Sequence, residues 1–173
     1  YETQAGGAGA DTISGGGGND TIVGNDGGND SLLGDENISN CPDGGVPGND
    51  SIFGHKGDDT IRGNDGDATL IGYKGDDSIA GGDGNDSILG GANSDRISGG
   101  NGEDTIHGDV GPGGFGDDTI DGGNGDDRIF AGFGDDTVHG GAGDDTVDLE
   151  NGNDTVNGGN GDDSLDGGWG NDS

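Results

Sequence analysis

The sequence is poor in everything that ordinarily builds a globular core. Only 23% of the 173 residues are hydrophobic and only 4% are aromatic. Apolar side chains this sparse cannot offset the conformational entropy that the chain loses on folding. A single cysteine, Cys41, excludes an internal disulfide as the missing source of stability. A folded state therefore needs stabilisation from outside the chain.

Positive charge is almost as scarce. Lys and Arg number 5 against 37 Asp and Glu, which gives a formal net charge of -32. Such a polyanion repels phosphates, so nucleic acid is not expected as a partner. No apolar run is long enough for a transmembrane helix, so no membrane span is expected either. The charge predicts that the missing partner is a cation.

Glycine is abundant, with 48 residues, and it recurs in a nine-residue phrase. Residues 122–148, for example, read GGNGDDRIF, AGFGDDTVH and GGAGDDTVD. The frame is G-G-x-G-x-D-x-U-x, in which U is Ile, Leu or Val and the sixth place is Asp in every frame but that of Ala68. The sixth-place aspartates are Asp11, Asp20, Asp30, Asp50, Asp59, Asp77, Asp86, Asp95, Asp104, Asp118, Asp127, Asp136, Asp145, Asp154, Asp163 and Asp172.

The frame predicts tight turns joined by short strands. Glycine takes a positive φ without strain, so G-G-x-G-x-D favours a turn, and x-U-x favours a three-residue strand with U facing inward. Two frames then make an 18-residue coil, and stacked coils form two parallel sheets around a thin aliphatic core. We expect an N-terminal junction segment at residues 1–5 and one roll over residues 6–173. Insertions at 34–44 and 108–112 are expected to be swollen turns.

This phrase resembles the calcium-binding nonapeptide of the repeats-in-toxin (RTX) family. The resemblance covers residues 6–173 and implies an all-β fold, a right-handed parallel β-roll (a β-solenoid) with Ca2+ in its turns. RTX repeats occur in proteases, lipases, toxins, adhesins and surface layers, so the resemblance leaves the biological role open.

Stacking would place the sixth-place aspartates of alternate frames above one another. Carboxylates stacked in this way repel unless a cation lies between them. Calcium suits the turns because it accepts six or more oxygens, including backbone carbonyls, whereas zinc and copper favour His or Cys. A site between each stacked pair gives about 15 Ca2+ ions, which would nearly cancel the formal charge of -32. Ala68 should weaken the sites beside it unless Asp65 or Asp67 substitutes.

No catalytic site is expected. His55, His107 and His139 fall at second or ninth places without a paired nucleophile, and the repeated Asp-Asp pairs indicate metal rather than an acid–base pair. We therefore expect a protein that is not an enzyme and that works outside the cell. The leading hypothesis is a Ca2+-dependent structural subunit of a fibre or matrix. The alternative is an RTX segment of a larger type I secreted enzyme, toxin or adhesin, and ice binding is the third.

Two surfaces are candidates for self-association. The ninth places of alternate frames form an apolar stripe suited to lateral contact, made of Val23, Phe53, Ile71, Leu89 and Phe130. For end-to-end contact, a second copy that followed Ser173 would bring Tyr1 close to the phase of the repeat. Within the longer insertion, Asn37 is a candidate for glycan attachment, and Cys41 is expected to be a free thiol.

Overall fold

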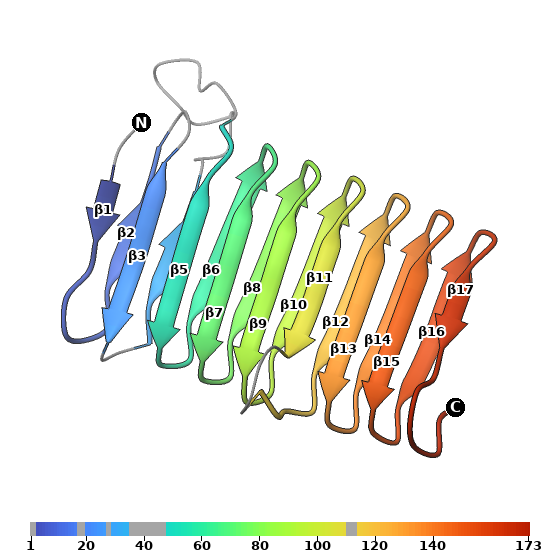
Figure 1. Cartoon of the computed structure of the whole chain (residues 1–173). Coiled ribbons are helices and arrows are strands. Elements are labelled where there is room, and N and C mark those ends of the chain that lie inside the picture. Colours follow the sequence, from blue (N-terminus) through green and yellow to red (C-terminus); the bar gives the residue numbers. More distant parts are fainter. Residues whose placement is uncertain (1–2, 17–19, 27–28, 35–47, 110–113) are drawn as a thin grey trace.

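The computed structural model describes residues 3–16, 20–26, 29–34, 48–109 and 114–173. In it the chain winds into two parallel sheets that face each other, with consecutive strands in opposite sheets (Figure 1). One sheet has nine strands in the order β1-β3-β5-β7-β9-β11-β13-β15-β17, and the other has eight in the order β16-β14-β12-β10-β8-β6-β4-β2. The expected all-β parallel β-roll is confirmed. Asn37 and Cys41 lie outside the described residues.

The nine-stranded sheet contains β1 (Thr3–Ala5), β3 (Thr21–Asp26), β5 (Ser51–Lys56), β7 (Thr69–Lys74), β9 (Ser87–Ala92), β11 (Thr105–Asp109), β13 (Arg128–Phe133), β15 (Thr146–Asn151) and β17 (Ser164–Asp166). The eight-stranded sheet contains β2 (Thr12–Ser14), β4 (Ser31–Leu33), β6 (Thr60–Asp65), β8 (Ser78–Asp83), β10 (Arg96–Asn101), β12 (Thr119–Asn124), β14 (Thr137–Ala142) and β16 (Thr155–Asn160). No helix long and apolar enough to cross a membrane occurs in the described residues.

Most strands are longer than the three residues expected from the frame. In β6, β8 and β10, for example, the extended chain continues through the first three places of the next frame, giving six residues. Alternation then gives each strand a second inward position, at the first place. The eighth-place aliphatics from Ile13 to Val147 form the core, whereas Val156 is partly buried against it and Leu165 is exposed. The first place is glycine except at Ala131 and Leu149, which are fully buried. The prediction of three-residue strands was therefore wrong for these elements, because the extended chain does not stop at the ninth place.

The register keeps like places together across both insertions. Ile97 pairs with Ile79 on one side and with Ile120 on the other, although extra residues separate β11 from β12. Gly34 and Gly108, the first residues of the two expected swollen turns, take ordinary first places, each beside the sixth-place aspartate of its own frame. The bounds of those turns stay a prediction, because residues 35–47 and 110–113 are not described.

The repeat pattern extends to both ends of the described chain. β1 belongs to the segment expected to be a junction, yet Gln4 pairs with Ile22 and so takes an eighth place. After β17 the ladder also continues, because the N–H of Ser173 donates to the carbonyl oxygen of Asp154 at 2.9 Å. The N–H of Thr155 makes the same bond one coil earlier, to Asp136.

Candidate calcium centre

The turn glycines serve two different needs. The second and fourth places need a positive φ, as at Gly123 (113°) and Gly125 (127°), and this conformation favours glycine. The first place needs space instead. A Cβ added to Gly122 would lie 2.5 Å from Oδ2 of Asp127 and closer still to the carbonyl oxygen of Gly140. The sixth-place carboxylate therefore folds back over the first-place glycine of its own frame, beside a carbonyl of the next coil.

The sixth-place aspartates form two columns, one along each edge of the roll. In each column Oδ1 accepts a hydrogen bond from the backbone N–H of the sixth-place residue one coil earlier, as from Asp77 to Asp95 at 2.8 Å. The first column contains Asp11, Asp30, Asp59, Asp77, Asp95, Asp118, Asp136, Asp154 and Asp172, and the second contains Asp20, Asp50, Asp86, Asp104, Asp127, Asp145 and Asp163. The structure thus brings together all the aspartates that the frame singled out.

The second carboxylate oxygen of most column members is buried without a donor. Such an Oδ2 atom occurs in Asp30, Asp59, Asp77, Asp86, Asp95, Asp104, Asp118, Asp127, Asp136, Asp145 and Asp154. The pKa of Asp95 is raised to about 8 and that of Asp118 to about 7, mainly by burial and in smaller part by neighbouring carboxylates. A buried anionic oxygen that lacks a hydrogen-bond donor is costly unless a cation contacts it.

The oxygen atoms of these turns suit a hard cation. Carboxylate oxygens and turn carbonyls are the ligands that Ca2+ accepts in a flexible shell. Within the described residues, no three His, Cys, Asp or Glu side chains converge on one point. A cation would therefore need backbone carbonyls to complete its coordination. That the sixteen aspartates are the ligands remains a prediction.

Ala68 interrupts the second column. Its N–H still donates to Oδ1 of Asp86 at 2.8 Å, so the backbone ladder passes through unbroken. However, the methyl group of Ala68 lies over Gly63, 2.9 Å from the position of a Cβ added to that glycine. Other frames place the carboxylate of the sixth-place aspartate here. Asp67 has a different contact, because its Oδ1 accepts the N–H of Asn85 on the exposed rim. Asp65 ends strand β6 and is half-buried.

Sequence reasoning missed a second, exposed ladder at the fifth place. Here the side chain of one coil accepts from the N–H of the next, as from Asp162 to Asp144 and from Asp144 to Asp126, both at 2.8 Å. The direction is opposite to that of the buried columns. The sequence feature that could have predicted this ladder is the acidic or amide residue that precedes most sixth-place aspartates. Each turn is therefore tied to the coil before it and to the coil after it.

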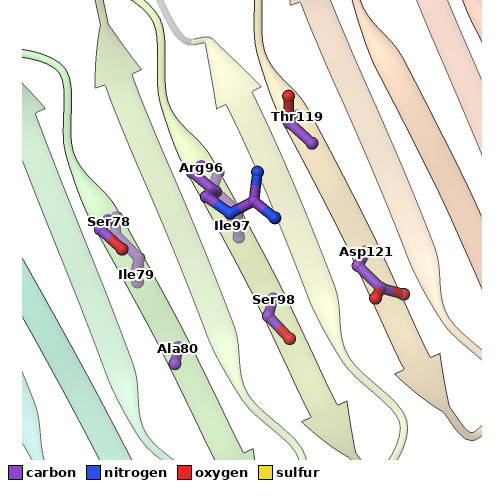
Figure 2. A pocket seen from close by; sticks show the side chains of 8 residues that line it. All are labelled: Ser78, Ile79, Ala80, Arg96, Ile97, Ser98, Thr119 and Asp121. Atoms are coloured by element: carbon purple, nitrogen blue, oxygen red, sulfur yellow. The ribbon is translucent and has the colours of Figure 1, made fainter.

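The outer face of the eight-stranded sheet has a shallow hollow, but its residues do not suggest catalysis. It lies over β8, β10 and β12, and Figure 2 shows Arg96 extending from β10 toward Thr119 and Asp121. Ser98, Asp121 and His139 occupy one cross-strand row. The aspartate lies between the serine and the histidine, so the histidine is not placed to act as the serine's base.

The frame and its columns agree with the comparisons. A search of curated proteins finds no match. The family model for the RTX calcium-binding nonapeptide repeat (4 copies) matches residues 5–30, 44–79, 62–97, 81–111, 112–147 and 139–173, leaving only 1–4 and 31–43 unmatched. This repeat is a structural calcium-binding unit and is not catalytic by itself. The chain therefore belongs to the RTX calcium-binding nonapeptide repeat family, and it forms a Ca2+-binding β-roll.

Proposed function

We propose that this chain is an extracellular structural module whose folding is driven by Ca2+ filling the two aspartate columns, with about 15 ions in all. The observation that supports it is the set of buried Oδ2 atoms without donors. Burying those carboxylates as anions opposes folding. A divalent ion bound between successive turns would make their burial favour folding instead. Extracellular calcium modules bind at about 10⁻⁴–10⁻³ M, so cytosolic Ca2+ would leave the chain unfolded until export.

A calcium titration followed by far-UV circular dichroism tests this proposal. We expect a disordered spectrum in chelator and a cooperative gain of strand signal at about 0.1–1 mM Ca2+. Mg2+ at the same concentration should be a poor substitute because it demands a stricter octahedron and keeps its waters. Equal strand signal in chelator and in Ca2+ would show that the fold does not depend on the metal.

We further propose that the folded roll self-associates through the outer face of the nine-stranded sheet. The ninth-place residues stand in register there, with Phe53 paired to Ile71 and Ile71 to Leu89. Farther along the same row the rings of His107 and Phe130 stack at 4.6 Å. This apolar row is half-buried within the monomer and continues across β3 to β13.

The charge distribution favours a second copy as the partner. Strands β5, β7, β9, β11 and β13 contain one carboxylate among them, the buried Asp109, and they carry Lys56, Lys74 and Arg128. The adjoining strands β15 and β17 contain Asp148, Glu150 and Asp166. On a chain of net charge -32, this face is where a second copy can approach with the least repulsion. The apolar and basic strands β5 to β13 of one copy can also contact the acidic strands β15 and β17 of another copy.

End-to-end addition is the second mode that we propose. Among the described strands, β1 pairs only with β3 and β17 only with β15, so each has one edge without a strand partner. Open strand edges are templates for another chain.

Electron microscopy and sedimentation in millimolar Ca2+ test both modes of association. Replacing Phe53 and Leu89 with Ser should abolish lateral assembly, whereas Leu33→Ser, on the opposite sheet, should not. Fibres that persist in the double variant would support end-to-end contact alone. Monodisperse single rods from the wild type would contradict both modes and favour the alternative, a folding segment of a larger exported protein.

A further inference from the structure

Asparagine followed by glycine recurs at the turns, where a third-place asparagine precedes the fourth-place glycine. Along the edge of the second column such pairs begin at Asn101, Asn124 and Asn160. All three asparagines are exposed and each is the last residue of its strand. Asparagine is a chemically labile residue, and a following glycine favours its deamidation because glycine has no side chain to hinder attack by its nitrogen. Since exposure is alike at the three pairs, any difference between them must come from their hydrogen bonds.

The backbone nitrogen that would attack is held in two of the three pairs. Gly102 donates its N–H to the carbonyl oxygen of Asn124 at 2.7 Å, and Gly125 donates to that of Ala142 at 2.7 Å. The N–H of Gly161, which follows Asn160, has no acceptor among the described residues. A nitrogen fixed between two coils cannot turn toward the preceding side chain unless the stack opens.

The side-chain amides differ in the same way. Nδ2 of Asn124 donates to Oδ1 of Asn101 at 2.7 Å, and Nδ2 of Asn101 donates to Oδ1 of Asp83 at 2.5 Å. Asn160 pairs in register with Ala142, whose methyl group offers no acceptor, and its side chain makes no hydrogen bond within the described part of the chain. Asn101 and Asn124 are therefore held at both reacting groups, whereas Asn160 is held at neither.

We propose that these pairs are deamidation sites that the calcium-loaded stack protects, so that loss of Ca2+ opens Asn101 and Asn124 to irreversible modification. The glycine nitrogen forms a bond to Cγ of the asparagine and loses its proton, while the Cγ–Nδ2 bond breaks and ammonia leaves. Water then opens the cyclic imide and gives aspartate or isoaspartate. The calcium switch in this inference rests on the proposed function, whereas the contrast between Asn124 and Asn160 rests on their hydrogen bonds alone.

Deamidation would damage the stack in two ways. Asn101 lies opposite Asp83 in register and donates to it, so an aspartate at this position would place two carboxylates side by side. Like charges on directly paired residues destabilise a sheet. Isoaspartate lengthens the backbone by one atom and would take the coil out of register. A chain kept without Ca2+ should therefore need more Ca2+ to refold the longer it waits.

Peptide mass spectrometry of the full chain, incubated in mildly alkaline buffer with millimolar Ca2+ or with chelator, tests the inference. In Ca2+ we expect Asn160 to deamidate at least about tenfold faster than Asn124, because protection requires local opening of the stack. In chelator, Asn101 and Asn124 should accelerate to the rate of Asn160, whose own rate should change little. Equal rates at Asn124 and Asn160 in Ca2+ would overturn the inference.

Two variants test the consequence for folding. Asn101→Asp, which faces Asp83, should move the folding midpoint to higher Ca2+. Asn160→Asp is the matched control, because it makes the same change opposite Ala142 and should leave the midpoint nearly unchanged. Equal midpoints in the two variants would contradict the proposed damage to the stack.

Circular dichroism of the incubated samples separates this inference from the proposed function. A chain that is unfolded in chelator but shows no acceleration at Asn124 would overturn the inference and leave calcium-driven folding standing. A chain that stays folded in chelator, with Asn124 still protected, would refute the proposed function and the calcium switch together. The contrast between Asn124 and Asn160 would then persist in both buffers.

Discussion

At the scale of single residues, the first-place glycine and the sixth-place aspartate share one space. Oδ2 of the aspartate and a carbonyl of the next coil both lie where a Cβ would stand. This explains why the first place is glycine in nearly every frame even though its φ is not positive. The glycine is therefore part of the candidate calcium site, because it admits the oxygens that would bind the ion.

Gly122→Ala should destabilise the calcium-loaded roll strongly. The new methyl group would overlap Oδ2 of Asp127 and the carbonyl of Gly140, and overpacking of this kind costs about 1–3 kcal/mol. Gly7→Ala is the control, since the only atom near its added Cβ lies 4.0 Å away. Urea unfolding in saturating Ca2+ should separate the two variants. Equal urea midpoints for Gly122→Ala and Gly7→Ala would contradict the steric crowding described at the first place.

Ala68→Asp should complete the second column. The new carboxylate would face Gly63 as its counterparts do in other frames and give the neighbouring turns a ligand that they lack. We expect native mass spectrometry to count at least one more bound Ca2+ and the folding midpoint to move to lower Ca2+. Ala80→Asp, on the outer face of β8, adds the same charge away from the column. If both variants bind equally, the gap at Ala68 is not a missing site.

At the scale of elements, each turn is held by two ladders that run in opposite directions. The sixth-place side chains accept from the preceding coil and are buried, whereas the fifth-place side chains accept from the following coil and are exposed. The buried ladder carries the oxygens that suit a metal. The exposed ladder aligns successive turns through ordinary hydrogen bonds and remains in contact with water.

Adjacent residues of one turn should therefore differ sharply in their contribution. Asp144→Ala removes an exposed acceptor for the N–H of Asp162 and should cost about 1 kcal/mol, the net contribution of an ordinary hydrogen bond. Asp145→Ala removes a column carboxylate and should also lower the number of bound Ca2+ ions. Calorimetric titration of the pair distinguishes the two roles. A loss of Ca2+ in Asp144→Ala equal to that in Asp145→Ala would contradict this division.

At the scale of the whole molecule, the roll is a stack of like charges around a thin core. The folded state raises the pKa of Asp77 and Asp118 to about 7 and of Asp95 to about 8, mainly through burial. In the unfolded chain these groups titrate near 3.8. Folding without metal therefore takes up protons, so the metal-free roll is stabilised fully below the unfolded pKa and loses that stabilisation as pH rises through about 6–8.

Acid should consequently replace part of the effect of calcium. In chelator, lowering the pH from 8 to 4.5 should increase the strand signal in circular dichroism. In Ca2+ the same change should weaken metal binding, because protons compete for the column carboxylates. A pH titration with and without chelator checks both directions. Strand signal in chelator that falls on acidification would show that the column carboxylates are not buried as described.

The nine-residue period by itself determined the architecture. Because glycine, Asp and one aliphatic recur at fixed places, only stacking of the coils in register aligns all three. This stacking in turn predicts the two aspartate columns and the apolar row of β3 to β13. The period could not show that the strands continue into the next frame, because glycine carries no side chain to mark an inward position. Nor could it show the direction of the fifth-place ladder, since both directions join the same residues.

Asp109 shows most clearly what only the tertiary structure decided. In the sequence it is one of many acidic residues beside a turn, at a place where other coils have glycine or an exposed side chain. Its burial depends on the backbone leaving the left-handed conformation there and on Gly132 in the next coil leaving space for it. Both conditions arise between coils, so a pattern confined to one frame does not contain them.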